Sequence, residues 1–312
     1  MLSRRSVRIK AMQLLFSVNR DEQLGLEEAK KRFWSSIEDT FSLYLCTVHA
    51  LLEVTKVASV DLAKRKAKRL PSDEDKKFKD KLYNNTLILN LDKNISLQRK
   101  IRALPFYSSI NKDYISNIYN DFAKKEEYKT YLSKDSTNKE HLDILLELFR
   151  HCRQHELFNE MLEDHYGTWQ DDKSVVIGAV KKTLKRLPEV EEEFFMDYYP
   201  SDDTVNEFGY QLMEKTLKGD AELLKHIEPT LKNWDSERLA IIDMISLKMA
   251  TCELVGFPSI PTKVTINEYV DIAKNYSTAK SKEFVNGVID RICADLASKG
   301  LINKAGRGLK DN

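Results

Sequence analysis

The sequence predicts an all-helical protein, and three observations support this class. Only 10 glycines and 7 prolines interrupt the 312 residues, which favours long helices over a fold with many turns. Apolar residues recur at helical spacing along most of the chain, the pattern that buries one face of a helix. With 42% hydrophobic and 32% charged residues, the chain is typical of a globular protein and is long enough for two compact domains.

Composition also limits the cellular setting. The net charge is +1, so a nucleic-acid partner would need a local basic patch. We see no run of about 18 apolar residues that would suggest a membrane span. The N-terminal arginine pair does not open an export signal, because Arg8 and Lys10 interrupt the apolar segment that should follow. The cysteines are far apart and form no CxxC pair, so we expect a cytoplasmic protein with reduced thiols.

The first two helices are predicted from the N-terminal third. One should span 4–19 and bury Val7, Ala11, Leu14, Leu15 and Val18. A long helix at about 35–70 should end in the basic run Lys64–Arg69, before Pro71 breaks it. Basic residues suit a helix C-terminus through the macrodipole, so we interpret this run as a solvated helix end rather than a binding site.

The middle of the chain is predicted to be helical in pieces separated by polar joints, at about 76–104, 112–132, 138–166 and 172–187. Helices at about 203–218, 220–232 and 237–254 should follow. Thr265-Ile266-Asn267-Glu268 reads as a capping box that starts the next helix, and the last helix should span about 279–299.

Asn286-Gly287 lies inside this last helix, although Asn-Gly is a strong hairpin signal. The flanking apolar residues, including Phe284, follow helical spacing, so we reject the hairpin. A glycine in a helix costs about 1 kcal/mol relative to alanine. We therefore expect Gly287 to let a neighbouring helix or chain approach closely, with Asn286 in a structural role.

Catalytic signatures are absent: the sequence has no Walker loop, no paired-glycine dinucleotide motif and no GxSxG elbow. A metal site is conceivable at His151, Cys152, His155 and His165, where two histidines lie one helical turn apart. No second Cys or His pair at metal spacing completes it. We expect ordinary helix-surface histidines, no metal and no cofactor.

Basic residues cluster in the first helix, where Arg4, Arg5, Arg8 and Lys10 occur without an acidic neighbour. At about 100° per residue, Arg5, Arg8 and Phe16 lie within an arc of about 80°. Guanidinium groups can hold phosphates and an aromatic ring can stack on a base, which would suit RNA. The alternative is a solvated helix end whose Phe16 is part of the core.

Residues 266–274 read INEYVDIAK, and residues 284–290 read FVNGVID. These two C-terminal motifs resemble the helix INE-x-(V/I)-(E/D)-(L/I)-A-K and the segment FVNGVLD of the transcription antitermination factor NusB family. The arginine-rich start, followed by Gln13 and Phe16, is similar as well. Asn267, Glu268, Phe284, Asn286 and Gly287 carry the resemblance as motif residues.

This resemblance implies a pair of small helical bundles with a large helical insertion after the first helix. The first helix would take residues 1–22, the insertion 23–199, the C-terminal helical domain 200–299 and a flexible tail 300–312. It also implies binding of boxA-type RNA from ribosomal RNA leaders together with the small-subunit ribosomal protein NusE, in the RNA polymerase antitermination complex. No catalysis is implied.

Position by position, Arg4, Arg5, Arg8 and Phe16 match the family's RNA-contacting residues, and Lys10 lies among them. Lys280, Ser281 and Lys282 match a second contact region. The chain departs from the family pattern at Lys280, where an acidic residue is common, at Glu283, where a lysine is common, and at Asp243, where arginine is usual.

Two other readings stand beside this one. The first is a helical protein–protein interaction scaffold with weak or no RNA binding. The second, an RNA cytosine methyltransferase with a NusB-like domain, would need a glycine-rich cofactor loop, which we do not find. If Arg5 and Arg8 hold phosphates, replacing both by alanine should flatten the salt dependence of RNA binding.

Overall fold

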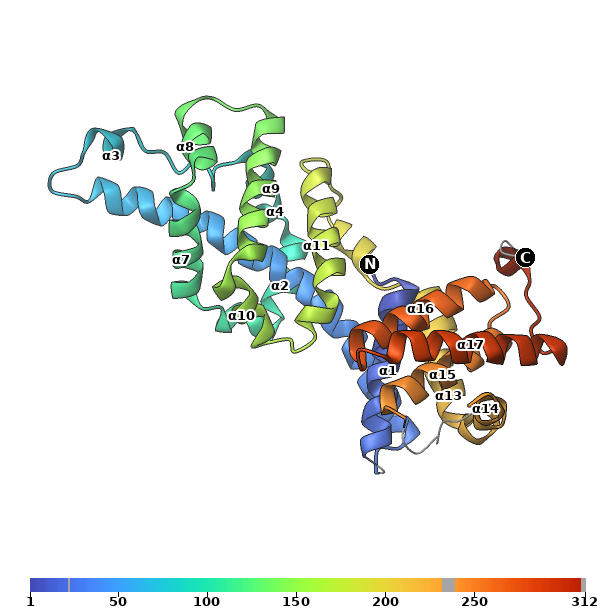
Figure 1. Ribbon diagram of the computed structural model, residues 1–312. Helices are drawn as coiled ribbons and strands as arrows, with labels where there is room; N and C mark the ends of the chain where they lie inside the picture. The colour runs from blue at the N-terminus through green and yellow to red at the C-terminus, as the bar shows by residue number, and fades with distance from the viewer. Residues whose placement is uncertain (22, 232–238, 310–312) are drawn as a thin grey trace. The chain divides into compact units, whose positions relative to one another are not determined.

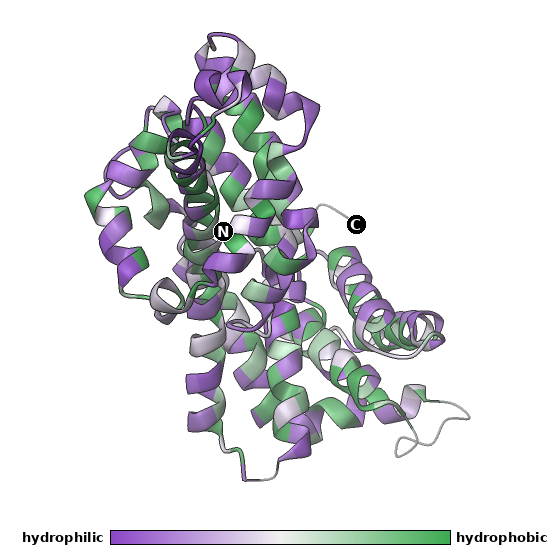
Figure 2. Ribbon diagram, turned by 90° about the vertical axis from the view of Figure 1, so that its left-hand side faces the viewer, coloured by the Kyte–Doolittle hydropathy of each residue, from purple (hydrophilic) through white to green (hydrophobic). Residues whose placement is uncertain are grey.

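A computed structural model describes residues 1–21, 23–231 and 239–309. Within these ranges the chain is helical and contains no strand, which confirms the predicted fold class (Figure 1). Figure 2 shows apolar residues recurring along one side of many helices, with hydrophilic residues on the other. The helices are thus stabilised by burying apolar faces against one another.

The chain divides into two compact units. Unit 1 comprises Met1 and Glu38–Tyr199, and unit 2 comprises Leu2–Ile37 and Pro200–Asn312. Residues 23–37, which we had expected to belong to the insertion, group with unit 2. Each unit has its own buried apolar cluster.

Helix α2 (Leu26–Lys66) is 41 residues long and contributes to both units. It contains a window that is apolar enough to cross a membrane by length and composition, but 72% of that window is buried inside the protein. Its residues Leu43, Tyr44 and Leu51 are almost fully buried in the apolar cluster of unit 1. The apolar character of α2 is therefore that of a core helix.

Ten further elements complete unit 1. They are α3 (Asp73–Lys77), α4 (Thr86–Lys93), α5 (Ile95–Arg102), α6 (Pro105–Ser109), α7 (Lys112–Ala123), α8 (Glu126–Ser133), α9 (Asn138–Gln154), α10 (Glu156–Glu163), α11 (Trp169–Arg186) and the 3-10 helix η1 (Phe194–Tyr198). Several are shorter than predicted, because polar side chains cap new helices inside the expected stretches. Asn94, inside the predicted stretch 76–104, both ends α4 and caps α5. Helix α9 begins where it was predicted, with a capping box between Thr137 and Glu140.

Unit 2 is built around α15, ten of whose sixteen residues are buried. Helices from both ends of the chain pack against α15. The elements of unit 2 are α1 (Arg4–Arg20), α12 (Asp202–Thr204), the π-helical turn η2 (Val205–Tyr210), α13 (Gln211–Lys218), α14 (Asp220–Ile227), η3 (Glu228–Thr230), α15 (Ile241–Gly256), α16 (Thr262–Tyr276), α17 (Ser281–Ser298) and η5 (Gly306–Leu309). The predicted helix ends at 232 and 237 lie outside the described residues.

No helix that the structure describes approaches Gly287 closely, whereas such an approach occurs at Gly209. Gly287 lies inside α17, as predicted, but a Cβ atom built there would meet nothing within 4 Å. On Gly209 in η2, a Cβ would lie 1.8 Å from Cγ1 of Val7 and 3.0 Å from Cζ of Phe33. Gly209, not Gly287, is the glycine that lets backbone and side chains pack closely.

One further expectation is corrected by tertiary contacts. Helix α16 begins at Thr262, so Thr265 and Glu268 lie in its interior and form no capping box.

The flexibility of the tail 300–312 stays a prediction, and the structure describes contacts of Lys304 and Ala305 with other residues of unit 2. Lys304 donates to the carbonyl oxygens of Glu253 and Phe257, and the amide of Ala305 donates to the carbonyl of Pro258.

Candidate nucleic-acid interface

Arg8 lies in the core of unit 2, although it was predicted to contact RNA. Its side chain is 2% exposed and that of Glu253, on α15, is 0% exposed. Nε and Nη2 of Arg8 donate to the two carboxylate oxygens of Glu253 at 2.8 and 2.6 Å. Such a two-point contact matches the guanidinium and carboxylate geometries, so the charge of Arg8 is used inside the protein.

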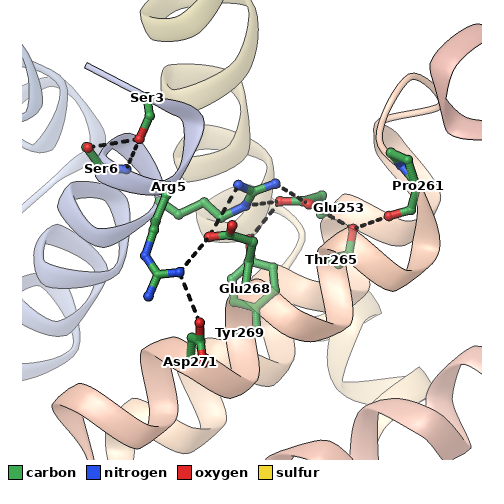
Figure 3. Close-up of polar contacts among 10 residues, drawn as sticks. Ser3, Arg5, Ser6, Glu253, Pro261, Thr265, Glu268, Tyr269 and Asp271 are labelled. Atoms are coloured by element: carbon green, nitrogen blue, oxygen red, sulfur yellow. Dashed lines mark hydrogen bonds and ion pairs between the residues drawn. The ribbon is translucent and has the colours of Figure 1, made fainter. Parts of the chain in front are cut away.

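Two hydroxyl groups complete the surroundings of Glu253 (Figure 3). Thr265 and Tyr269, one turn apart on α16, donate to its carboxylate at 2.8 and 3.0 Å. The guanidinium carbon of Arg8 also lies 4.8 Å from the ring centroid of Phe208. A buried carboxylate is tolerated here because four donors reach it.

The electrostatics of this cluster keep both donors protonated. Burial by itself would lower the pKa of Arg8, but the hydrogen bonds and negative charge of Glu253 outweigh burial and raise it. Burial and the neighbouring Glu253 raise the pKa of Tyr269 well above its usual value. Arg8 therefore keeps its positive charge at neutral pH, and the hydroxyl of Tyr269 keeps the proton that it donates to Glu253.

Arg5 forms ion pairs with α16 and remains partly exposed. Its Nη1 donates to Asp271 at 3.0 Å and lies 4.0 Å from Glu268, and its side chain is 42% exposed. Figure 3 shows Arg5 beside Glu268 and Asp271. Glu268 also lies 3.8 Å from Nη1 of Arg8, so it is close to both arginines. The acidic residues of the segment 266–274 thus hold the arginine-rich start of α1.

The other candidates on α1 differ in exposure. Arg4 is exposed, with its guanidinium carbon 5.5 Å from the ring centroid of Phe208. Lys10 is buried at 4% exposure. Phe16 is partly buried against the apolar cluster of unit 2, and Arg20 lies over its ring at 5.6 Å. The accessible charge of α1 therefore comes from Arg4, Arg20 and part of Arg5.

The three RNA contacts predicted at the start of α17 differ in their exposure to solvent. Lys280 and Lys282 are exposed, whereas Ser281 is buried at 1% exposure. The hydroxyl of Ser281 donates to Asp243 at 2.7 Å and lies 3.0 Å from the hydroxyl of Ser277. Asp243, one of the positions at which the sequence departs from the motif pattern that it resembles, is thus a buried residue that fixes the start of α17.

The motif residues fall into two groups. Glu268 and Phe284 point toward the interior of unit 2. Glu268 lies close to Arg5 and Arg8, and Phe284 packs on the apolar cluster of this unit. Asn267 and Asn286 are exposed, and the amide of Asn286 donates to Asp290 on the same helix at 3.3 Å. Gly287, the neighbour of Asn286 on α17, has open space beside it, so packing within the unit does not account for these two motif residues.

The four metal candidates contact protein groups instead of one another's ligand atoms. His151 lies 3.1 Å from the carbonyl of Ile118, His155 lies 3.4 Å from Asp121, and His165 lies 2.6 Å from Ser109. Cys152 is buried, and burial raises the pKa of its thiol. Over residues 1–21, 23–231 and 239–309, no group of three or more His, Cys, Asp or Glu side chains could hold a metal.

The sequence analysis missed Glu253, Tyr269 and Phe208, which enclose Arg8. One signal for Glu253 was present: it is the single charged residue in the apolar stretch Met249–Val255 of a predicted helix. A carboxylate placed there needs a buried partner of opposite charge. That partner comes from a helix more than 240 positions away in the sequence, so local spacing could not identify it.

Comparison with known families gives one match. A model described as the NusB family matches residues 175–294. This range includes most of α11, the helices from α12 to α16 and most of α17, and it does not reach α1. No solved structure matches the chain.

Three curated relatives, each described as transcription antitermination protein NusB, match part of the chain. The protein of Salinibacter ruber is 46% identical over 108 residues, which cover 35% of this chain and 68% of the relative. That of Chloroherpeton thalassium is 32% identical over 136 residues, covering 44% and 64%. That of Koribacter versatilis is 35% identical over 107 residues, covering 34% and 73%. The chain therefore spans about two thirds of the length of each relative.

Proposed function

This chain belongs to the NusB family, and from that premise we propose that it is an RNA-binding transcription antitermination factor. The family is non-enzymatic, so we assign no catalytic residue. We propose boxA-type RNA of ribosomal RNA leaders as its ligand, bound together with the ribosomal protein NusE. Its setting would be the RNA polymerase antitermination complex in the cytoplasm.

The observation that carries the RNA proposal is the pair of exposed basic helix starts in unit 2. Arg4 on α1 and Lys280 and Lys282 on α17 are exposed, and Arg5 keeps about two fifths of its side-chain surface free, with an exposed fraction of 42%. Exposed cations at fixed positions can neutralise phosphates and release counterions. Phe16 supplies a partly exposed ring for a base.

We assign Arg8, Lys10 and Ser281 as positioning residues instead of contacts. Their side chains are between 1% and 4% exposed. Arg8 fixes α1 onto α15 and α16, and Ser281 fixes the start of α17 through Asp243. An Arg5→Ala and Arg8→Ala double variant is thus a poor test, because it would disturb the core as well as the surface.

A sharper test removes exposed charge only. We expect the triple variant Arg4→Gln, Lys280→Gln and Lys282→Gln to bind boxA-type RNA more weakly in the presence of NusE. If each cation holds one phosphate, the slope of log K against log salt concentration should decrease by about 2, at roughly 0.7 per contact. Fluorescence anisotropy at several salt concentrations measures this slope.

The matched control removes three exposed charges elsewhere in unit 2, with Lys225→Gln, Lys263→Gln and Lys299→Gln. It should keep the wild-type slope. An equal decrease in both variants would mean that only the overall charge matters, and the assigned contacts would be wrong.

A helical interaction scaffold remains the second candidate, favoured by the exposed Asn286 next to Gly287, which has open space beside it, and by the exposed Asn267 on α16. It predicts that NusE binds while the wild-type protein shows no measurable affinity for boxA-type RNA. The same titration, run with and without NusE, separates the two functions.

A further inference from the structure

A second concentration of positive charge lies in unit 1, at residues 64–81, which we call the basic tip. It consists of the end of α2, the following loop, α3 and the loop after α3. In Figure 1 the end of α2 extends past α7 to an edge of unit 1, where α3 lies. The basic tip contains nine basic and four acidic residues, a net charge of +5 in a chain whose total is +1.

An internal ion cluster holds the basic tip in shape. Asp75, whose side chain is 5% exposed, pairs with Arg65 at 3.2 Å and with Lys68 at 2.9 Å. Asp75 also closes a capping box with Ser72 at the start of α3. The guanidinium carbon of Arg65 lies 4.3 Å from the ring centroid of Phe78. The loop is therefore tied to the end of α2 at several points.

The acidic residues of the basic tip are mostly occupied. Besides Asp75, Asp73 pairs with Lys76, and Asp80 accepts hydrogen bonds from Ser59 and Asn84. Five exposed cations form no ion pair with any carboxylate that the structure describes: Lys64, Lys66, Arg69, Lys77 and Lys79. The surface of the basic tip is thus an uncompensated array of cations on a fixed backbone.

The helix macrodipole does not account for this array. It stabilises cations within the last turn of a helix, which here includes Lys64 and Lys66. Lys77 is the last residue of α3, which is only five residues long and therefore has a small dipole. Arg69 and Lys79 lie beyond the ends of α2 and α3, where the dipole gives little benefit. A solvated helix end therefore leaves at least Arg69 and Lys79 unexplained.

We propose that the basic tip binds the phosphate backbone of RNA, at a site separate from the starts of α1 and α17. Backbone recognition needs fixed cations and little apolar area. A membrane surface or a protein partner would favour a larger exposed apolar face. Among the described residues of the basic tip, Leu70 is the one large apolar side chain that is strongly exposed, at 90%. This inference goes beyond the proposed function and does not depend on boxA recognition.

The full-length protein allows a direct test with labelled single-stranded oligo(U) RNA as the probe. We expect the variant Lys64→Gln, Lys66→Gln, Arg69→Gln and Lys77→Gln to lower the salt slope by about 2 to 3. Its affinity at about 0.1 M salt should fall at least tenfold, since each lost phosphate contact contributes several-fold. These four side chains take no part in the Asp75 cluster, so the fold should persist.

The control variant removes four exposed charges elsewhere in unit 1, with Lys112→Gln, Lys124→Gln, Lys129→Gln and Lys139→Gln. It has the same net charge as the tip variant and should keep the wild-type slope. Unchanged binding by the tip variant, or an equal loss in the control, overturns the inference. So does a tip variant that keeps its affinity for oligo(U) but no longer sediments with phosphatidylglycerol vesicles, because the partner would then be a membrane surface.

The experiments can refute each of the two RNA proposals independently of the other. If the Arg4, Lys280 and Lys282 variant loses boxA binding while the tip variant binds both RNAs like the wild type, only the inference about the basic tip is wrong. If the tip variant loses oligo(U) binding while the triple variant is unaffected with boxA-type RNA, only the proposed contacts in unit 2 are wrong.

Discussion

Arg8 and Glu253 form a doubly hydrogen-bonded ion pair that is almost completely shielded from water. A buried pair of this kind contributes little over an apolar pair, yet removing one partner leaves a buried charge without compensation. Thr265 and Tyr269 also depend on the position of Glu253. We therefore expect Arg8, one of the residues predicted to contact RNA, to act mainly on stability.

We predict that Arg8→Ala destabilises unit 2 by about 3 to 5 kcal/mol, because Glu253 would stay buried without its cation. Urea unfolding followed by circular dichroism measures the change. Arg4→Ala, at an exposed position of the same helix, should change stability by no more than about 0.5 kcal/mol. Similar effects of the two substitutions would contradict the structural role of Arg8.

A second prediction at the residue scale concerns Asp75 in the basic tip. The hydrogen bond from Lys68, followed by that from the backbone of Ser72, lowers the pKa of Asp75 to about 2. The pKa of Asp75 is lower in the folded protein than its unfolded value of about 3.8. The ion cluster therefore stabilises the basic tip at pH values above about 3.8, and this stabilisation is lost as the pH falls toward 2. Carboxyl NMR titration should show this low pKa, and Lys68→Gln should raise it. An Asp75 that titrates near its unfolded value in the wild type would refute the cluster.

At the scale of the elements, two glycines have opposite surroundings. Gly209 in η2 faces Val7 on α1, and Gly287 in α17 has open space beside it. The sequence singled out Gly287 because it interrupts a predicted helix, whereas only the contact with α1 distinguishes Gly209. The pair therefore serves as a matched test of the packing in unit 2.

We predict that Gly209→Ala destabilises unit 2 by about 1 to 3 kcal/mol, because its methyl group would overlap Cγ1 of Val7. Gly287→Ala should raise the stability by up to about 1 kcal/mol, since alanine is the better helix former. Thermal unfolding measures both. Adding Val7→Ala to Gly209→Ala should relieve the overlap, so the double variant should lose less than the sum of the single substitutions. A strictly additive loss would argue against the contact.

At the scale of the whole molecule, the chain combines a NusB-family part with a helical unit that has its own core. The match to the family model covers 175–294, whereas unit 1 consists largely of residues outside that range. The exposed cations of both units can then contribute to one RNA-binding free energy. Counterion release depends on the number of neutralised phosphates and not on which unit neutralises them.

We therefore predict additive salt slopes on an RNA long enough to reach both sites. The decrease measured for the combined variant, with the exposed cations of α1, α17 and the basic tip removed, should equal the sum of the two separate decreases. Anisotropy titrations of the four proteins supply the comparison. A combined decrease no larger than either single one would show that each surface contacts RNA only when the other is intact, and a combined decrease larger than the sum would show that the two surfaces compete for the same phosphates.

The sequence by itself determined the helical class, most helix positions and the family, because these depend on local periodicity and on short contiguous motifs. The segments 266–274 and 284–290 could be identified without any contact information. It also located the basic clusters, since charge is a property of composition.

Only the tertiary structure decided which of those charges face solvent. Arg4 and Arg8 look alike in sequence, yet one is exposed and the other is buried against Glu253, 245 positions away. Thr265 and Glu268 have the spacing of a capping box, but packing against α15 and α1 gives them other partners. The physical reason is the same in each case: a polar side chain is satisfied by whatever the fold brings within hydrogen-bonding distance, and residues far apart in sequence supply those groups.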